Sequence, residues 1–302
     1  MCDTTFAFGQ RGNHFIQCPS RLHHTRLPKK LQSLLSSNQI SQIYHVALGC
    51  ENSFLLAYRD KKGKDHLESQ DLPPEISEFI YARNKHNQHL RNIPNLRLTL
   101  GPYNTSFFVH DESACLWMNL PLPLLNALQS RIKNGAWIDK PRIVALGASS
   151  NFLLITQNHA AFWDLSQYRT LSHMLEFSKT QDHGIQEVKT VILHPYRFQG
   201  FVAQSWNGTL IYENLPSEAM GGMNAMRAAI MKDTKEGDRR KSDLGAKRGE
   251  SVQRRPSARK QEILRREWRD RKERFRAEAR GLKLSLSLSI SAGEIGFGGS
   301  VG

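Results

Sequence analysis

Paired basic residues are the feature of the chain most capable of chemistry, and they lie toward its C-terminal end. Between residues 239 and 260, arginine and lysine occur in short clusters separated by polar residues. Such clusters can contact phosphates or the acidic grooves of a nuclear import receptor. We expect this segment to bind one of these, or else to be a solvated linker. The candidate contact residues are Arg239, Arg240, Lys241, Lys247, Arg248, Arg254 and Arg255.

Two serines follow arginine pairs at the spacing that basophilic kinases prefer. They are Ser242, after Arg239-Arg240-Lys241, and Ser257, after Arg254-Arg255-Pro256. A phosphate at either serine would remove nearly two positive charges locally. We therefore treat Ser242 and Ser257 as candidate phosphorylation sites that could switch binding.

Residues 257–281 alternate arginine with glutamate and contain no proline before Gly281. This pattern predicts a charged helix stabilised by i,i+4 pairs such as Glu262 with Arg266. Its apolar side is narrow and includes Trp268 and Phe275, which we expect to contact a protein partner. Nucleic acid is the less favoured ligand of this helix, because the interleaved carboxylates would repel phosphates.

The twelve histidines and four cysteines form no pattern of metal ligands or catalytic groups. His86 and His89 have no carboxylate or cysteine at a metal-binding interval, and there is no Cys-x-x-Cys. The chain also lacks a Gly-x-Ser-x-Gly elbow, a phosphate-binding Gly-x-x-x-x-Gly-Lys-Ser/Thr loop and a His-Glu-x-x-His helix. We therefore expect no metal, no cofactor and no enzymatic activity. The alternative is an enzyme whose site is assembled from several repeats.

The chain has 302 residues and a net charge of +14, with no apolar run of the roughly 20 residues that a membrane span needs. Residues 217–302 carry 21 Lys+Arg and 12 Asp+Glu, so most of the excess charge lies there. The first residues do not show a basic segment followed by an apolar stretch, the pattern of a secretory signal. We expect an intracellular protein of the nucleus or cytoplasm, with free thiols.

A repeated phrase organises the first two-thirds of the chain. It consists of a short apolar run that ends in glycine and a second apolar run a few residues later. The spacing of the copies averages about 46 residues, which is typical of small β modules. The first runs are Phe6–Gly9, Val46–Gly49, Leu98–Gly101, Val144–Gly147 and the degenerate Val191–His194.

A second phrase follows each copy and predicts a short helix. Leu-Pro occurs at Leu27, Leu72, Leu120 and Leu215, and Leu165-Ser166 takes its place in the fourth copy. Proline suits the first turn of a helix, where its missing N–H is not needed. Each unit thus reads as strand, tight turn, strand, third strand and short helix. We attribute the glycine to a positive φ in the turn, and its loss at His194 predicts a different turn there.

These patterns predict a mainly β protein: a propeller-like array of about five three-stranded repeats with short helices between them, plus a C-terminal charged helix. Such modules must stack, because one alone cannot bury both faces. The expected organisation is a repeat domain at 1–216, a methionine-containing helix and basic flexible linker at 217–256, a charged helix at 257–281, and an alternating strand with a glycine-rich tail at 282–302. We expect the stripe of Met220, Met223, Met226, Ile230 and Met231 to pack over the end of the repeats.

The phrase Val-Ala-Leu-Gly followed by Phe-Leu-Leu and the Leu-Pro helix resembles the repeats of a group of uncharacterised fungal β-propeller-like proteins, over roughly residues 4–216. It is more distantly similar to the chromatin-condensation-regulator and WD-type repeats, through Phe162-Trp163-Asp164. The chain lacks the Gly-Gln-Leu-Gly of the first of these and the Gly-His of the second. The resemblance implies a propeller fold and a protein-binding platform.

The leading hypothesis is therefore a non-enzymatic scaffold of β repeats that binds a protein partner, with the basic C-terminal arm as a second contact. One alternative is a protein that associates with nucleic acid or chromatin through residues 232–281. The other is an enzyme with its site at the propeller axis.

Overall fold

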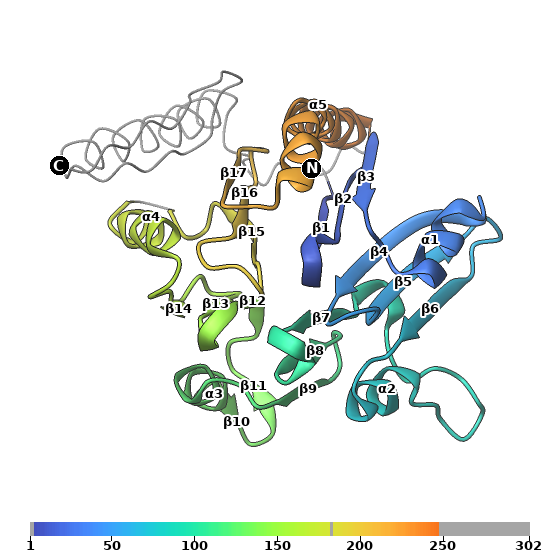
Figure 1. Ribbon diagram of the computed structural model, residues 1–302, viewed down its shortest axis with the longest axis horizontal. Helices are drawn as coiled ribbons and strands as arrows, with labels where there is room; N and C mark the ends of the chain where they lie inside the picture. Colours follow the sequence, from blue (N-terminus) through green and yellow to red (C-terminus); the bar gives the residue numbers. More distant parts are fainter. Residues whose placement is uncertain (1–2, 182–183, 248–302) are drawn as a thin grey trace. The chain divides into compact units, whose positions relative to one another are not determined.

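The computed structural model describes residues 3–181 and 184–247. Residues 1–250 belong to one compact unit, and residues 251–302, which form a second unit, lie outside the described part. The compact unit is built from five repeats of a sheet followed by a helix, numbered here as units 1 to 5. Figure 1 shows the five sheets around a common centre, with β1, β4, β7, β12 and β15 innermost. The prediction of a mainly β, repeated architecture is confirmed.

Each unit contains a three-stranded antiparallel sheet whose strands pair in chain order. The apolar run before each glycine forms the innermost strand, as its repeated sequence predicts. The sheets are β1 (Thr5–Phe8), β2 (His14–Cys18) and β3 (Arg21–Thr25); β4 (Ile40–Leu48), β5 (Phe54–Asp60) and β6 (Asp65–Gln70); β7 (Arg97–Leu100), β8 (Phe107–His110) and β9 (Cys115–Met118); β12 (Pro141–Leu146), β13 (Phe152–Thr156) and β14 (Ala161–Asp164); β15 (Val188–Leu193), β16 (Phe201–Ser205) and β17 (Leu210–Glu213). A separate hairpin joins β10 (Ile132–Lys133) to β11 (Ala136–Trp137).

A helix follows the third strand of every unit. In units 1 to 3 the proline of the Leu-Pro phrase is the residue just before the helix, with an extended backbone that leads the chain into the first turn. No helix in the described residues combines the length and the apolar character that crossing a membrane requires. The helices are α1 (Lys29–Ser36), α2 (Pro74–Tyr81), α3 (Leu122–Gln129), α4 (Arg169–Lys179) and α5 (Ser217–Lys247).

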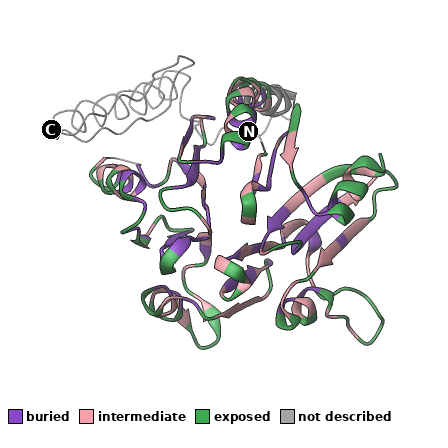
Figure 2. Ribbon diagram, in the orientation of Figure 1, coloured by how far each residue is buried: buried purple, intermediate pink, exposed green. Residues whose placement is uncertain are grey.

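The helices fill the spaces between neighbouring sheets. Sheets that diverge from a common centre leave a gap at the outside, and an amphipathic helix can close it with its apolar side. Leu31 of α1 packs in one cluster with Phe15 of unit 1 and Phe54 of unit 2. Ile76 of α2 and Leu124 of α3 occupy the corresponding positions between units 2 and 3 and between units 3 and 4. The buried residues accordingly concentrate near the centre and beneath the helices (Figure 2).

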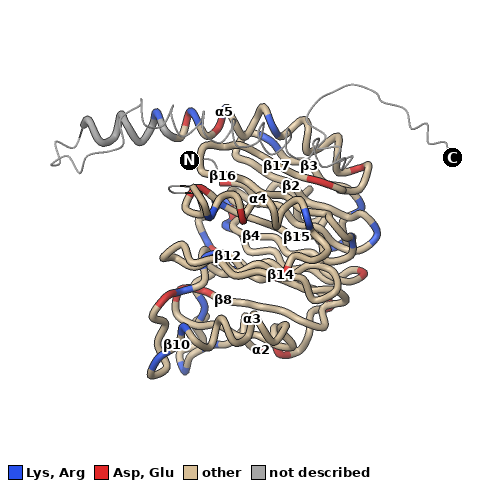
Figure 3. The backbone as a smooth tube through the Cα atoms, turned by 90° about the vertical axis from the view of Figure 1, so that its left-hand side faces the viewer, with Lys and Arg blue, Asp and Glu red and all other residues tan. Residues whose placement is uncertain are grey.

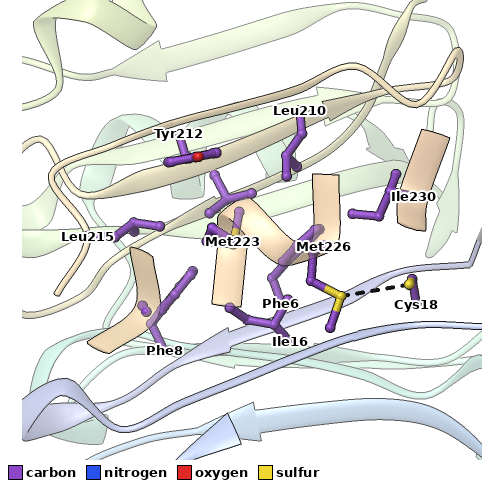
Figure 4. Packing of buried hydrophobic residues seen from close by; sticks show 12 residues of the cluster. Phe6, Phe8, Ile16, Cys18, Leu210, Tyr212, Leu215, Met223, Met226 and Ile230 are labelled. Carbon is purple, nitrogen blue, oxygen red and sulfur yellow. Dashed lines mark hydrogen bonds between the residues drawn. The ribbon is translucent and has the colours of Figure 1, made fainter. Parts of the chain in front are cut away.

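Helix α5 occupies the same position between the last sheet and the first. Its buried Met223, Met226 and Ile230 pack with Phe6 of β1 and Leu210 of β17 (Figure 4). The Cys18 thiol of β2 lies 3.7 Å from the Met226 sulfur. The methionine stripe therefore joins two ends of the repeat array that are about 200 residues apart in sequence.

The structure corrects two of the expected boundaries. The compact unit does not end at residue 216, because the first half of α5 is part of its core. Residues 232–247 are not a flexible linker but continue the same helix. The Asp233 carboxylate accepts hydrogen bonds from the backbone N–H (3.0 Å) and hydroxyl (2.9 Å) of Ser20, which hold this part of the helix to the β2–β3 turn.

Glycine at the end of the innermost strands serves a purpose other than the predicted one. Gly9 and Gly147 have φ values of −118° and −115°, which other residues adopt readily. What excludes a side chain is close packing: a Cβ on Gly9 would lie 2.7 Å from the Asn13 amide oxygen, and one on Gly147 would lie 2.6 Å from the Tyr168 hydroxyl. The expectation of a positive φ at these glycines is therefore wrong. The different turn predicted after His194 is present, since His194 N–H bonds to Gly200 O across a longer loop.

Candidate functional site: the turn face

The turns that follow the five innermost strands form one face of the compact unit, here called the turn face. Innermost strands occupy equivalent places in successive units, so each delivers its turn to the same end of the sheets. Hydrogen bonds between the turns, described below, show that they meet. The turns span residues 9–13, 49–53, 101–106, 147–151 and 194–200.

Four of these turns place a non-glycine residue in the left-handed backbone region, two positions after the glycine. The residues are Arg11 (φ 59°), Glu51 (φ 53°), Tyr103 (φ 55°) and Ser149 (φ 51°), and all four are exposed. A residue with a Cβ in this region costs roughly 1 kcal/mol relative to glycine. The chain thus retains four different side chains, basic, acidic, aromatic and hydroxyl, at positions where glycine would be less strained.

Side chains of neighbouring units lock the turns of units 1, 2 and 3 together. The Gln10 amide oxygen accepts the backbone N–H of Glu51 (3.1 Å), and Gln10 N–H bonds to Gly49 O (3.3 Å). The Asn104 side chain accepts the backbone N–H of Cys50 (3.1 Å) and donates to the Ser53 hydroxyl (2.8 Å). These contacts fix the relative positions of three turns before any ligand arrives.

The turn of unit 5 reaches across to unit 3. The Tyr196 hydroxyl accepts the backbone N–H of Tyr103 (3.2 Å), and the two rings pack edge to face at 5.5 Å. Burial raises the pKa of Tyr196, so the phenol stays protonated in the neutral range. This contact spans non-adjacent units.

Unit 4 is joined to unit 5 by a buried tyrosine. The Tyr168 hydroxyl donates to His194 O (2.8 Å) and accepts the N–H of Ala148 (2.9 Å). Burial raises the pKa of Tyr168 to about 12, so its proton remains available for the bond to His194 O. Together these contacts make the turn face rigid, which limits the ordering cost of binding a partner.

The ends of the third strands support the turns from outside. Arg26 donates to Arg11 O (3.2 Å) and pairs with Glu218 of α5 (3.1 Å). In unit 5, Asn214 donates to Phe198 O (2.7 Å). Both residues have positive φ and precede the Leu-Pro phrase, so the same local geometry recurs in different units.

Two large apolar side chains point out from this rigid frame. Tyr103 is 63% exposed and Phe198 is 51% exposed. Arg11 and Arg197 are exposed on the turns of the adjoining units 1 and 5. Aromatic and arginine side chains are those most often responsible for the energy of protein–protein contacts. The turn face therefore has the residue types of a protein-binding surface.

The axis between the innermost strands contains a small cavity of about 70 Å³ with a mainly apolar lining. Strands of all five units contribute to it, among them those that carry Phe6, Leu98 and Ile192. The polar side chains in the lining are engaged with backbone groups of the next unit: Thr99 donates to Val144 O (2.9 Å), and His45 Nε2 lies 3.1 Å from Leu98 N and 2.9 Å from Leu98 O. Burial lowers the pKa of His45 to about 3. This lining favours packing over catalysis.

Among the residues that the sequence singled out as contacts, those in the described part of the chain lie on α5 and not in the turns of the turn face. Arg239 is exposed on α5, and Arg240, Lys241, Ser242 and Lys247 belong to the same helix. The predicted contacts Arg248, Arg254, Arg255, Trp268 and Phe275 and the phosphorylation candidate Ser257 lie outside the described residues.

His86 and His89 lie on a loop rather than a helix, and within residues 3–181 and 184–247 no three His, Cys, Asp or Glu side chains gather as metal ligands. None of the exposed residues of the turn face was predicted from the sequence. Their only sequence signal is a position two residues after a repeated glycine, and nothing about arginine, glutamate, tyrosine or serine indicates a left-handed backbone.

Comparisons with known proteins identify no family. No family model matches the chain, and no curated protein matches it. Among solved structures, the chain is similar to the β-propeller domain of Cps50 (Swd1) from Myceliophteria thermophila, with 9% sequence identity and a TM-score of 0.27. That match covers 67% of this chain and 80% of the other.

Proposed function

We propose that the compact unit is a five-bladed propeller, closed by α5, that acts as a non-enzymatic scaffold and binds a protein partner on its turn face. The observation that carries the proposal is the set of four strained, exposed side chains at equivalent positions of successive turns. Strain of this kind is retained where the surrounding structure holds it and a function uses it.

Closure by α5 supports the propeller. Helices α1, α2 and α3 each pack between their own sheet and the next, and α5 does the same between unit 5 and unit 1. The side chains of Thr4 in unit 1 and Gln204 in unit 5 are hydrogen-bonded, and Phe8 stacks on His194 with ring centroids 5.5 Å apart. Both contacts join the first unit directly to the last.

A protein is the partner that fits the turn face best. Tyr103 and Phe198 offer aromatic anchors on a frame that is already ordered, and Arg11 and Glu51 offer charges of both signs around them. Mixed charge disfavours a polyanion here, whereas a peptide or protein surface can match both signs.

The direct test is affinity capture from native extract with the full-length chain and with the double variant Tyr103→Ala, Phe198→Ala. We expect the partner that the wild type retains to be lost, by at least tenfold in recovered amount, because two anchors at the centre of an interface typically contribute more than about 2 kcal/mol each. Ile138→Ala is the matched control, because Ile138 is equally exposed, at 61%, but lies beside the β10–β11 hairpin.

Retention of the partner by the double variant would overturn the proposal, as would loss by both variants. Turnover of a substrate by the purified chain would overturn the non-enzymatic part.

The basic arm is proposed as a second contact of the same scaffold. It begins within α5 at Arg239 and continues through Phe275. A chain that ends at Lys247 keeps the whole described part of α5, with Arg239, Arg240, Lys241 and Lys247, and removes the rest of the arm. We expect this truncation to weaken capture of the partner without abolishing it. Unchanged capture would show that the residues after Lys247 are not a second contact.

A further inference from the structure

We propose that a basic band on the opposite face of units 2 and 3 binds the phosphate backbone of a nucleic acid duplex. That face, here called the hairpin face, carries the turns between second and third strands and the loops that follow the helices. The basic band is Lys61, Lys62, Lys64, Arg83, Lys85, Lys133 and Lys140. It is separate from the turn face and from the C-terminal arm.

The first part of the band is the tip of the β5–β6 hairpin. Lys61, Lys62 and Lys64 are all exposed there. The Asp60 carboxylate accepts the backbone N–H groups of Lys62 (2.8 Å) and Lys64 (2.9 Å), and Gly63 supplies the positive φ (82°) that closes the turn. The three ammonium groups are therefore displayed from an ordered turn rather than from a flexible loop.

The second part is an ordered loop after α2 that makes unit 2 longer than the other units. Ala82 and Leu90 are hydrogen-bonded across its base (2.9 Å), and Arg83 pairs with His89 in a β-bridge. The Asn84 side chain accepts the N–H groups of His86 (2.8 Å) and Gln88 (3.0 Å). Residues 82–92 contain no acidic residue, and Arg83 and Lys85 are exposed. Insertions of this kind in repeat proteins often form the binding surface.

The third part lies in unit 3 and joins the second through the β8–β9 turn. Asn92, at the end of the loop, donates through its side chain to Glu112 (3.0 Å) and through its backbone to Asp111 (3.0 Å). Lys140 bonds to Glu112 O (3.4 Å) from the other side. Exposed Lys133 lies on the β10–β11 hairpin, a few residues before Lys140 in the chain.

Acidic residues near the band are mostly occupied. Asp60 pairs with His66 (2.8 Å), and Asp65 pairs with Arg59 (2.7 Å). Asp111 is buried and accepts the N–H groups of Ser113 (2.8 Å) and Ala114 (2.7 Å) in addition to that of Asn92. The seven cations of the band form no ion pair within the part of the chain that the structure describes.

The positive charges of two parts of the band act on the same histidine. Burial and the neighbouring charges of Arg83 and Lys64 lower the pKa of His89. Lys64 belongs to the hairpin tip and Arg83 to the loop, so the two parts lie close enough to influence the same imidazole. Crowded like charges raise the free energy of the unbound protein, and a polyanion relieves that cost.

A duplex backbone is the polyanion that the residues fit. Lysine and arginine on ordered tips can follow successive phosphates without reading bases. Residues 60–65 and 82–92, which carry five of the seven cations, contain no Phe, Tyr or Trp, the side chains that single-stranded binding would use for stacking. Figure 3 shows lysine and arginine gathered around β10, with fewer acidic residues among them.

The test uses the full-length chain and a 20-base-pair DNA duplex as the probe, with affinity measured over a range of salt concentrations. In the band variant, Lys61, Lys62 and Lys64 are each changed to Gln. Each phosphate contact contributes about 0.9 to the slope of log K against log salt. We expect the band variant to bind at least tenfold more weakly at 0.1 M salt, with a slope about 2 to 3 smaller in magnitude.

The matched control removes the same charge outside the band through Arg11→Gln and Arg197→Gln on the turn face and Lys29→Gln at the start of α1, and should keep nearly the wild-type slope. Equal loss in both variants would show an effect of net charge alone and overturn the proposal. So would unchanged binding by the band variant, or binding of phosphatidylserine vesicles in place of the duplex. Unchanged partner capture by the band variant keeps this test distinct from that of the turn face.

Discussion

The two faces of the compact unit treat strained backbone positions in opposite ways. On the hairpin face, glycine or asparagine occupies most left-handed positions, such as Gly63, Asn87 and Gly208, with His159 as an exception. On the turn face, the equivalent positions of four units hold Arg11, Glu51, Tyr103 and Ser149. The turn face therefore accepts this conformational cost in four successive units, whereas the hairpin face mostly avoids it.

The faces also differ in how their chemistry is organised. The turn face is cross-linked between units by side chains, as in the contact between Tyr196 and Tyr103. The hairpin face carries its charge on separate protrusions, each ordered by its own internal hydrogen bonds, such as those of Asp60 and Asn84. A cross-linked surface suits one shaped partner, whereas separate cationic tips suit an extended anion.

The largest expected effect comes from breaking the closure on which both faces depend. Met226→Asp would place an unpaired carboxylate among Phe6, Ile16 and Leu210. We expect the free energy of unfolding to fall by about 4 kcal/mol or more. Chemical denaturation measures the loss, and Ala228→Asp on the exposed side of α5 is the control, expected to stay within about 1 kcal/mol of wild type. Similar stability of both variants would mean that α5 does not close the core.

Acidification should destabilise the turn face through His194. Burial, with a smaller contribution from Arg197, lowers the pKa of His194 to about 4, and Nδ1 accepts the N–H of Tyr196 (3.2 Å). In the unfolded chain the His194 imidazole takes up a proton near pH 6.5, whereas in the folded chain it stays neutral at that pH. The contribution of neutral His194 to the free energy of unfolding is therefore fully present above pH 6.5 and is lost as the pH falls toward 4. At pH 5 the free energy of unfolding should be lower by about 2 kcal/mol.

The measurement for this residue is the free energy of unfolding at pH 7.5 and pH 5 in wild type and in His194→Gln. The glutamine variant should lose about 2 kcal/mol less than wild type between the two pH values. An equal pH dependence would show that His194 is not held neutral by its surroundings.

The smallest effect separates strain from binding on the turn face. Ser149→Gly should stabilise the fold by about 0.5 to 1 kcal/mol, because glycine adopts φ of 51° without steric cost. The same change at His159 of the hairpin face should stabilise by a similar amount. We expect only Ser149→Gly to weaken capture of the partner, modestly. Destabilisation by Ser149→Gly in thermal unfolding would show that the turn is not strained.

Much of the architecture could be predicted because its determinants are local. The apolar runs around Gly49 and Gly101 encode two adjacent strands, and the Leu-Pro phrase encodes a helix start. The role of the glycines could not be predicted, because it depends on Asn13 and Tyr168 approaching from elsewhere in the fold. The extent of α5 was missed for the same reason, since its polar half is held by Ser20, which lies 213 positions away from Asp233.

The candidate site was predictable only in outline. A repeat scaffold predicts binding through its loops, but the choice among loops rests on backbone angles. From the sequence, Tyr103 is an ordinary turn residue. Its positive φ and its contact with Tyr196 are known only from the structure. The charged loop at 82–92 was visible as an unusually long spacing between repeats, yet its order comes from Asn84, whose side chain gave no signal of that role.

The most direct test of the turn face is site-specific photo-crosslinking in the full-length chain. A benzophenone amino acid is placed at position 103, 198 or 138, and the crosslinked products from native extract are compared by mass spectrometry. The account predicts that positions 103 and 198 capture the same partner and that position 138 does not capture it. Capture from position 138 alone, or from none of the three while the partner still copurifies, would contradict it.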